Sequence, residues 1–309
     1  MTSTETADHE SDQPVMPFTG ERFTPECERE IWYEHYHRYA FACPLVKGKT
    51  VLDAASGEGY GTHLLATTAA RAVGVDVDSD TIAHARRRYG AVTRGKVPEF
   101  IQASCDHLPF EDSSFDVVVS FETLEHLSAQ EAMLAEFERV LKPNGFIIIS
   151  TPDKAIYSDA TGYDNPYHVK ELYRHEFQAL LDEHWPAQQW LGQKMAFFSV
   201  LWHQQRNGLS SMDARILGKD GALLAGKIPW VPVYHVVVAA KKAEYLPPVA
   251  DVHFFADEPE SVYGHYHAVI RAHIRAEQEL HHLKNALRRW HRIPVLGRWL
   301  KYLEKKHGI

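Results

Sequence analysis

Short apolar runs and longer segments with helical periodicity alternate along the middle of the chain. The apolar runs begin at Val51 and continue at residues 73–77, 100–103, 115–120 and 146–150. Amphipathic segments separate them, of which 81–89 and 128–141 are the clearest. The run 115–120 is almost continuously apolar, as a parallel strand that is buried on both faces requires. This alternation predicts an α/β protein with a Rossmann-like, doubly wound and mostly parallel sheet.

The pattern changes after the run that ends near Ser150. Residues 153–170 are polar and rich in tyrosine, and a helical segment follows over 171–184. Residues 188–202 and 230–240 are expected to form two closing strands of a hairpin, interrupted by an insertion at 205–227. Loops at the carboxyl ends of strands form the walls of binding sites in such sheets. We therefore expect the loop 153–170 to face the substrate.

Both ends of the chain differ from this central region, which we assign to residues 49–242. Residues 1–17 are rich in Thr, Ser, Asp and Glu and predict a disordered tail. Residues 18–48 contain a predicted helix, 28–44, that is dense in aromatic residues. Most of these aromatic residues are expected to pack in the core, but the segment is also placed to form a helical lid over a cofactor. Arg38 could then pair with a cofactor carboxylate.

The C-terminal region is predicted to be a helical tail, residues 259–309, joined by a linker over 243–258. Its apolar residues recur every three or four positions, so one face should pack on the domain itself, on a second copy or on a glycosyltransferase partner. A basic and aromatic end, 299–306, leaves peripheral contact with an anionic membrane surface as the alternative. The tail is therefore predicted either to pack against protein or to contact a membrane surface.

Composition limits the classes of partner and compartment. The formal net charge of −8 over 309 residues argues against a nucleic-acid-binding protein. Cys27, Cys43 and Cys105 are few and far apart, which is typical of a reducing compartment. We find no apolar run of about 20 residues and no pattern of a secretory signal, so we expect a cytoplasmic protein.

The stretch from Asp53 to Gly61 carries the first candidate chemistry. It reads D-A-A-S-G-E-G-Y-G and joins an apolar strand to a helix, and a second strand ends at Asp76 about one βα unit later. Glycines allow the backbone to turn tightly and to approach a ligand, and an acid after the second strand is placed to bind ribose hydroxyls. The glycine spacing departs from the dinucleotide fingerprint. A carboxylate at Asp53 suits a sulfonium or α-amino group better than a pyrophosphate.

The motifs that follow make the resemblance specific. The segments LPFEDSSFDVVVSFETLEHL and FERVLKPNGFIIISTP, together with the glycine loop and Asp76, resemble class I S-adenosylmethionine (SAM) dependent methyltransferases over residues 51–152. The resemblance implies a seven-stranded sheet with a closing antiparallel hairpin and SAM as the cofactor. The chain has Ala55, Ser56 and Ser104 where the family usually has Gly, Cys and Asp, so Cys105 and Asp106 would have to carry the adenine contact. The residues expected at the cofactor are Arg38, Asp53, Ala55, Gly57, Glu58, Gly59, Asp76, Val77, Ser104, Cys105, Asp106, Ser120 and Phe121.

The acceptor is predicted from the flanking segments. The flanks GERFTPE, EHYHRYAFA and NPYHVKELYRHEF resemble a bacterial branch associated with cell-surface polysaccharide pathways. This resemblance implies O-methylation of a sugar hydroxyl on a glycan or glycoconjugate, with Tyr157, Tyr163 and Tyr167 at the acceptor. Two alternatives stay open: methylation of a quinone, lipid or antibiotic-like small molecule, and a SAM-binding scaffold that recruits glycosyltransferases.

A hydroxyl acceptor needs a group that removes its proton. Glu125 and His126 follow the fourth strand, and His168 lies in the acceptor-side loop. Imidazole commonly accepts protons near neutral pH, so His168 is the first candidate and His126 the second, while His168 could instead be structural. Glu171, one turn further on, could orient the ring of His168. Neighbouring histidines elsewhere are spaced at i,i+1 or i,i+2, which does not place both on one helix face, so we expect no metal.

Overall fold

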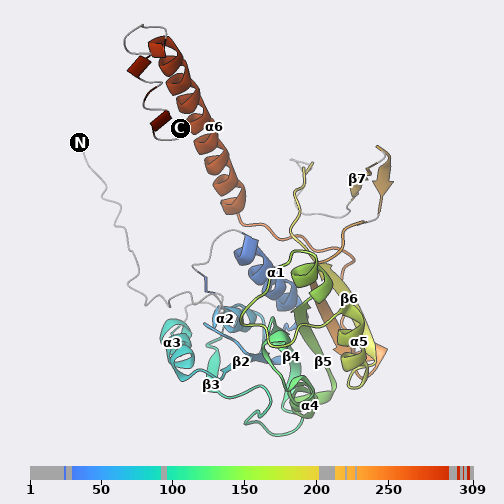
Figure 1. The fold of residues 1–309 in the computed structure, drawn as a ribbon. Helices are drawn as coiled ribbons and strands as arrows, with labels where there is room; N and C mark the ends of the chain where they lie inside the picture. Colours follow the sequence, from blue (N-terminus) through green and yellow to red (C-terminus); the bar gives the residue numbers. More distant parts are fainter. Residues whose placement is uncertain are drawn as a thin grey trace, which may run out of the picture. The chain divides into compact units, whose positions relative to one another are not determined.

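The computed structural model describes residues 24–25, 30–91, 96–201, 213–219, 221–226, 228–291, 298–299, 302 and 305–306 (Figure 1). The predictions for the tail 1–17 and for parts of the lid, the insertion and the C-terminal end lie outside these residues. The chain divides into two compact units, 1–255 and 256–309, and each is described by itself. The division falls inside the predicted linker.

One seven-stranded mixed sheet organises the first unit, in the order β3-β2-β1-β4-β5-β9-β6. Its strands are β1 Thr50–Ala54, β2 Arg71–Asp76, β3 Glu99–Gln102, β4 Phe115–Phe121, β5 Leu141–Pro152, β6 Ala187–Gln193 and β9 Tyr234–Ala240. The first five strands pair in parallel, and β9 runs antiparallel to both β5 and β6. The predicted Rossmann-like sheet with a closing hairpin is confirmed.

Helices cover both faces of this sheet (Figure 1). They are α1 Glu30–Leu45, α2 Tyr60–Ala66, α3 Ser79–Tyr89, α4 Gln130–Val140 and α5 Arg174–Asp182, with short turns η1 Leu124–His126, η2 Ala155–Asp159 and η3 Ala243–Tyr245. The start of α3 follows the sequence prediction, because the Asp78 carboxylate accepts from the Asp80 amide at 3.0 Å. The last turn of α3 contains Arg86, Arg87 and Arg88, whose positive charges suit the negative C-terminal end of the helix dipole.

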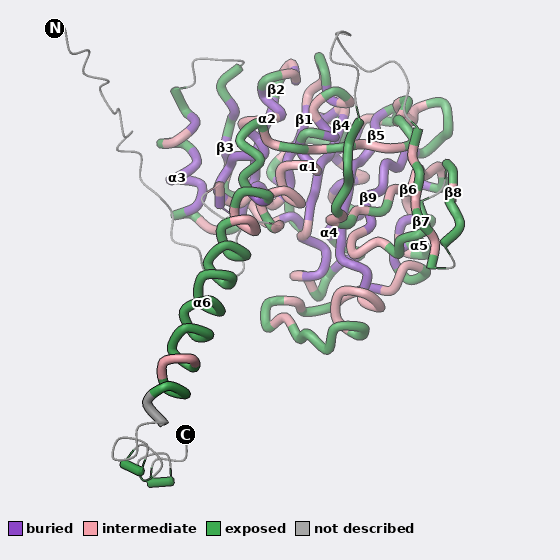
Figure 2. Tube along the Cα trace, turned by 90° about the horizontal axis from the view of Figure 1, so that it is seen from above, coloured by how far each residue is buried: buried purple, intermediate pink, exposed green. Residues whose placement is uncertain are grey.

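The core forms two apolar layers, one on each face of the sheet (Figure 2). Val117 and Val119 of β4 face the layer that α1, α2 and α3 cover, whereas Val118 faces the layer under α4 and α5. Alternate residues of a strand point to opposite faces, so a strand covered on both sides has no polar face. This explains the valine run in the sequence.

Three boundaries differ from the prediction. The closing strands are shorter, because β6 ends at Gln193 and residues 194–201 form neither helix nor strand. The insertion contains a small hairpin, β7 Arg215–Leu217 and β8 Leu223–Ala225, that its sequence did not indicate. The turn expected at 143–145 lies inside β5, where the register with β4 shifts between Phe115 and Val117. A bulge therefore replaces the turn.

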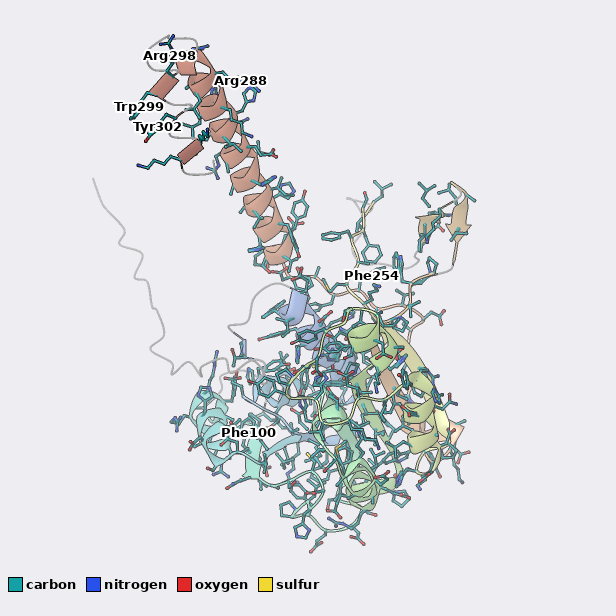
Figure 3. All side chains as sticks on the ribbon, viewed as in Figure 1. Phe100, Phe254, Arg288, Arg298, Trp299 and Tyr302 are labelled. Carbon is teal, nitrogen blue, oxygen red and sulfur yellow. The ribbon has the colours of Figure 1, made fainter. Side chains whose placement is uncertain are left out.

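The second unit is dominated by one long helix, α6 Ser261–His291. Val262 in its first turn is buried, whereas most of the apolar side chains further along are exposed, among them Val269, Ile270, Ile274, Leu280 and Leu283. The side chains that it displays can be followed in Figure 3. Self-association through this face stays a prediction. In the described part of the chain, none of the helices is long and apolar enough to cross a membrane.

Gly61 is the point at which α1 meets the first turn of α2. A Cβ at this position would lie 2.0 Å from the ring of Tyr39, which is buried and hydrogen-bonded. We expect Gly61→Ala to lower the free energy of unfolding by about 1–3 kcal/mol through overpacking, although alanine is the better helix former. Urea unfolding of the full chain measures this.

Gly264→Ala is the matched control, since Gly264 also lies in a helix and a Cβ there would meet nothing within 4 Å. It should not lower the stability. Equal unfolding midpoints for the two variants would show that the contact between Tyr39 and Gly61 does not restrain α1.

Candidate active site

The loop between β1 and α2 adopts backbone angles that favour glycine. Gly57 has φ 54° and Gly59 has φ 99°, and Ala55 also has a positive φ, 60°. The family usually has glycine at the position of Ala55, and the left-handed conformation explains that preference. A Cβ on Gly59 would also lie 2.8 Å from the ring of Phe100, which Figure 3 labels on β3. The tight turn is thus fixed partly by packing against the sheet.

Asp76 joins this loop to the end of β2. One carboxylate oxygen accepts from the Gly57 amide at 3.0 Å, and the other accepts from the Asp78 amide at 3.0 Å. The side chain is buried at the carboxyl end of its strand, beside the glycine loop. This position suits contact with ribose hydroxyls, as the sequence predicts.

Asp53 lies deeper, at the end of β1. Its carboxylate accepts from the Tyr39 hydroxyl at 3.0 Å and from the Thr62 hydroxyl at 2.6 Å, and the residue is 1% exposed. Burial raises the pKa of Asp53 to about 7, against the effect of these two hydrogen bonds. Sequence reasoning did not assign Tyr39 to the site; its place in the aromatic stripe beside Arg38 was the only available signal.

Two buried hydroxyls near this loop have unused hydrogen-bonding capacity. The Oγ atoms of Ser56 and Ser120 make no hydrogen bond within the described structure. Ser56 follows β1 and Ser120 lies near the end of β4, the two central strands of the sheet. Buried polar atoms of this kind normally have a partner. A polar cofactor over these strand ends would provide one, so the residues present fit such a group.

Arg38 reaches the site from α1. Its guanidinium donates to Gln193 at 2.8 Å, lies 3.8 Å from the Glu122 carboxylate and stacks over the ring of Tyr234. The side chain is buried, and its Nε has no hydrogen-bond partner in the described structure. The predicted contact with a cofactor carboxylate remains a prediction. Glu122, Gln193 and Tyr234 surround the guanidinium and were not foreseen from the sequence.

The side chain of Glu58, a residue of the glycine loop, turns toward α3. Its carboxylate lies 2.8 Å from His84 Nε2 and 2.9 Å from the Arg88 guanidinium, and it accepts from the Tyr89 hydroxyl at 2.7 Å. All three partners belong to α3. The side chain therefore holds the loop to α3, and only the backbone of Glu58 is free to approach a cofactor.

The remaining predicted cofactor residues lie at the ends of β2, β3 and β4. Val77 is 68% exposed beside Asp76, and Phe121 is buried against the ring of Tyr39. The hydroxyl of Ser104 donates to Asp106 at 2.5 Å. Cys105 is buried, and burial raises the pKa of its thiol to about 12, so it offers a neutral surface and not a thiolate.

The three catalytic candidates come together at the ends of β4 and β5. Glu125 and His126 belong to η1, and His168 lies in the loop after β5. The rings of His126 and His168 meet edge to face with centroids 5.1 Å apart. Glu125 is buried and accepts from the Thr151 hydroxyl at 3.0 Å, and burial raises its pKa well above the usual range. The parallel sheet thus joins residues more than 40 positions apart.

His168 is held from both sides. Its Nδ1 lies 2.5 Å from Glu171 Oε1, and its Nε2 lies 2.9 Å from the amide nitrogen of Asn165. The Asn165 amide can only donate, so Nε2 is the acceptor and Nδ1 carries the hydrogen that points to Glu171. The ring also stacks on Tyr157, with centroids 5.2 Å apart. Tyr163 and Tyr167 lie on the exposed side of the same loop.

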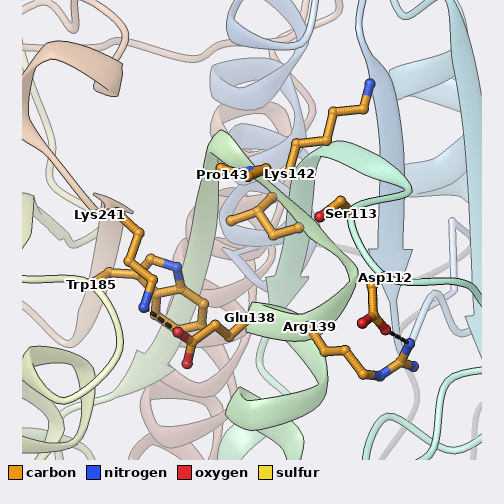
Figure 4. A pocket seen from close by; sticks show the side chains of 9 residues that line it. Asp112, Ser113, Glu138, Arg139, Lys142, Pro143, Trp185 and Lys241 are labelled. Carbon is orange, nitrogen blue, oxygen red and sulfur yellow. Dashed lines mark hydrogen bonds and ion pairs between the residues drawn. The ribbon is translucent and has the colours of Figure 1, made fainter.

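A hollow of about 320 Å³ lies at the other edge of the sheet (Figure 4). It is lined by Asp112, Glu138, Arg139, Trp185 and Lys241, among others. Leu141, the first residue of β5, also borders it, so the hollow lies at the amino ends of the parallel strands. Cofactors bind at the carboxyl ends in such sheets. The hollow is therefore separate from the site described above.

Comparisons with known proteins identify the family of the chain. A family model described as "Methyltransferase domain" matches residues 52–149. A probable S-adenosylmethionine-dependent methyltransferase of Mycobacterium tuberculosis, Rv3030, is 34% identical over 73% of this chain and 80% of its own length. The chain belongs to the SAM-dependent methyltransferases. A probable SAM-dependent methyltransferase of Mycolicibacterium smegmatis is 38% identical, over 54% of this chain and 64% of its own length.

The family assigns SAM as the methyl donor, in agreement with the sequence prediction. Among solved structures, the YcgJ protein of Bacillus subtilis aligns with 67% of this chain and all of its own, with a TM-score of 0.48 and 17% identity.

None of these similarities supports the predicted glycan branch. Two of the relatives whose names give an acceptor are a fatty-acid O-methyltransferase of M. smegmatis and a demethylmenaquinone methyltransferase of Clavibacter sepedonicus. The first is 36% identical over 39% of this chain and 41% of its own length, and the second is 36% identical over 38% and 48%.

If Asp53 lies beside the cation of SAM, as the sequence predicts, SAM binding should depend on pH. The Asp53 pKa of about 7 means that the carboxylate is largely protonated at pH 6 and ionised at pH 8. A cationic ligand beside it binds the ionised form more tightly, so SAM affinity should rise from pH 6 to pH 8 and then level off. Calorimetric titration across this range measures the effect.

Asp53→Asn should remove this pH dependence. Asp76→Ala is the comparison variant: it should weaken binding at every pH by roughly 1.5–3 kcal/mol, as loss of hydrogen bonds to a charged group does, without flattening the profile. An affinity that falls between pH 6 and pH 8 would contradict the placement of the cation near Asp53.

Proposed function

We propose that this methyltransferase transfers the methyl group of SAM to a hydroxyl of an apolar small molecule, of the lipid or quinone class, with His168 as the general base. The observation that carries the proposal is an exposed apolar surface that follows β6, at the end of the sheet where the His168 loop also begins. The named acceptors of two relatives, a fatty acid and demethylmenaquinone, point to the same class.

The apolar surface is defined here as residues 197–201, which follow β6, with residues 228–231, which precede β9. Phe197 is 83% exposed and Leu201 is 98% exposed. Phe198 contacts the rings of Trp230 and Phe254, with centroids 5.6 and 5.4 Å apart; Phe254 is labelled in Figure 3. Exposed apolar groups that gather in this way usually mark an interaction site.

The surface and the catalytic candidates share one edge of the sheet. β6 runs parallel to β4 and β5, so the chain leaves it after Gln193 at the edge where His126 and His168 lie. The return strand β9 begins at the same edge with Tyr234, whose ring lies 6.0 Å from that of Tyr157. An acceptor could therefore rest its apolar part on the surface and present a hydroxyl to His168.

The geometry of His168 suits proton removal. Nε2 carries the lone pair, which the Asn165 amide has to release before the acceptor hydroxyl can use it. Nδ1–H points to the Glu171 carboxylate, which would stabilise the imidazolium that forms. As Nε2 takes the hydroxyl proton, the oxygen forms its bond to the methyl carbon and the carbon–sulfur bond breaks. Holding the reacting groups in line can be worth about 7–11 kcal/mol of the barrier.

A sugar hydroxyl is the second candidate acceptor. The loop after β5 is polar, and Tyr163 and Tyr167 are exposed beside the half-buried Tyr157. Aromatic rings with hydroxyl groups are suitable platforms for sugars. The apolar surface has no evident role in this alternative, which is why we place it second.

His168→Ala tests the base. The variant should bind SAM with unchanged affinity. Its kcat should fall by about 10²–10⁴-fold, because no base remains to take the proton of the substrate hydroxyl. Glu171→Gln should cause a smaller loss. His175→Ala is the control, since this histidine of α5 stacks only on Tyr173 among the ring contacts of the described residues. Normal turnover by His168→Ala at saturating acceptor would assign the base to His126.

Phe198→Asp distinguishes the two acceptor classes. Labelled SAM is offered with an isoprenoid hydroquinone, a hydroxylated lipid or a methyl glycoside. For an apolar acceptor, the variant should lower kcat/KM by about 10-fold or more through a raised KM, as the loss of one buried aromatic contact implies.

Val97→Asp is the matched control, an equally exposed apolar residue before β3. Methylation of the glycoside alone, unaffected by Phe198→Asp, would overturn the apolar acceptor and favour the sugar.

A further inference from the structure

Three ligand-forming side chains converge beside the acceptor. One ligand atom from each of Glu125, His126 and His168 lies within 4.8 Å of the other two, and His126 Nε2 is 4.0 Å from Glu125 Oε1. Among the described residues, these three form a group with metal-binding spacing, in which two residues come from η1 and one from the loop after β5. Glu125 is buried, and both histidines are shielded in part.

The tautomers of both histidines are fixed by bonds at the far side of each ring. His126 Nδ1 lies 3.0 Å from the Tyr167 carbonyl oxygen, which can only accept, so Nδ1 carries the hydrogen. His168 Nδ1 carries its hydrogen toward Glu171. Both Nε2 atoms are therefore left with a lone pair. Histidines that bind metal ions are held in this way, through an N–H bond to a carbonyl or a carboxylate.

We propose that Glu125, His126 and His168 form a binding site for a divalent transition-metal ion, of which Zn²⁺ is the best match. Two imidazoles and one carboxylate are a ligand set that suits zinc, with water completing the coordination. Zinc bonds of about 2.0–2.2 Å place ligand atoms roughly 3.5 Å apart, so the side chains must close by about 1 Å. The amide of Asn165 leaves Nε2 of His168 when the ion binds.

The site rests on the proposed function in one respect only, its position at the acceptor. The ion and the base compete for the same lone pair, because His168 Nε2 cannot hold a proton and a metal together. A bound ion therefore blocks proton removal by His168. Metal binding itself is measured without turnover, so it can be tested separately from catalysis.

The test uses the full chain after treatment with a chelator. Zn²⁺ is titrated by calorimetry, and Co²⁺ is titrated by its visible absorption, which reports the ligands directly. We expect one site that weakens by more than about 100-fold in His126→Ala and in His168→Ala. In Glu171→Gln, the carboxylate that accepts from His168 Nδ1 becomes a neutral amide, and metal binding should weaken by about 10–100-fold. SAM binding by each variant confirms that it is folded.

The chain has 20 histidines, several on α6, so background binding needs a control. His281→Ala changes an exposed histidine of α6 and should leave the tight site and its Co²⁺ spectrum unaltered. Zn²⁺ affinity and Co²⁺ absorption that are the same in wild type and in the double variant H126A/H168A would overturn the proposal. An enzyme that is inactive without metal and restored by Zn²⁺ would support the site while refuting His168 as the base.

Discussion

The parallel direction of five strands is the constraint on which the site depends. Each of these strands ends at the same edge, so the residues that follow them meet there however far apart they are in the chain. Asp53, Asp76 and the Glu125–His126 pair follow β1, β2 and β4, and His168 follows β5. The strand β9 runs antiparallel to them, so it brings its first residue, Tyr234, and not its last to this edge. Cofactor and acceptor groups are thus brought together by topology before any side-chain contact acts.

The same edge concentrates ionisable groups in a buried setting. Glu34 is an example: burial raises its pKa to about 7, while the nearby Arg38 guanidinium opposes the shift. For Arg38, burial favours the neutral form, but Glu122, Tyr234 and Glu34 outweigh it and raise the pKa. A buried ion pair of this kind adds little net stability. The same ion pair still fixes the position of α1 against β4 and β9, because Glu122 follows β4 and Tyr234 begins β9.

The sequence predicted the elements of the sheet well, because their signals are local. The valines of β4 and the Asp78 cap of α3 each act within a few residues, and the structure agrees with both. The ends of β6 and β9 were placed less well: Phe197 and Leu201 read as strand residues by composition, yet they are exposed and outside the sheet. Apolar composition alone therefore does not tell a buried strand residue from an exposed one in a connecting segment.

The direction of individual side chains was harder to predict than their position. Glu58 lies in the glycine loop as expected, but its carboxylate turns to three partners on α3 that no local pattern reveals. Tyr39 was one aromatic residue among many until its contact with Asp53 and Gly61 appeared. Long-range partners of this kind depend on how helices pack on the sheet, which single-residue periodicity does not encode.

The two histidines at the acceptor show why position alone leaves chemistry open. In both His126 and His168, Nδ1–H is directed to an oxygen, which leaves the lone pair on Nε2. What differs is the partner: a neutral carbonyl behind His126 and a carboxylate behind His168. A carboxylate stabilises an imidazolium far better than a carbonyl does, which is the reason for proposing His168 and not His126 as the base. The asymmetry of the outer bonds, a carboxylate on one side and a carbonyl on the other, is thus the feature that distinguishes the two rings chemically.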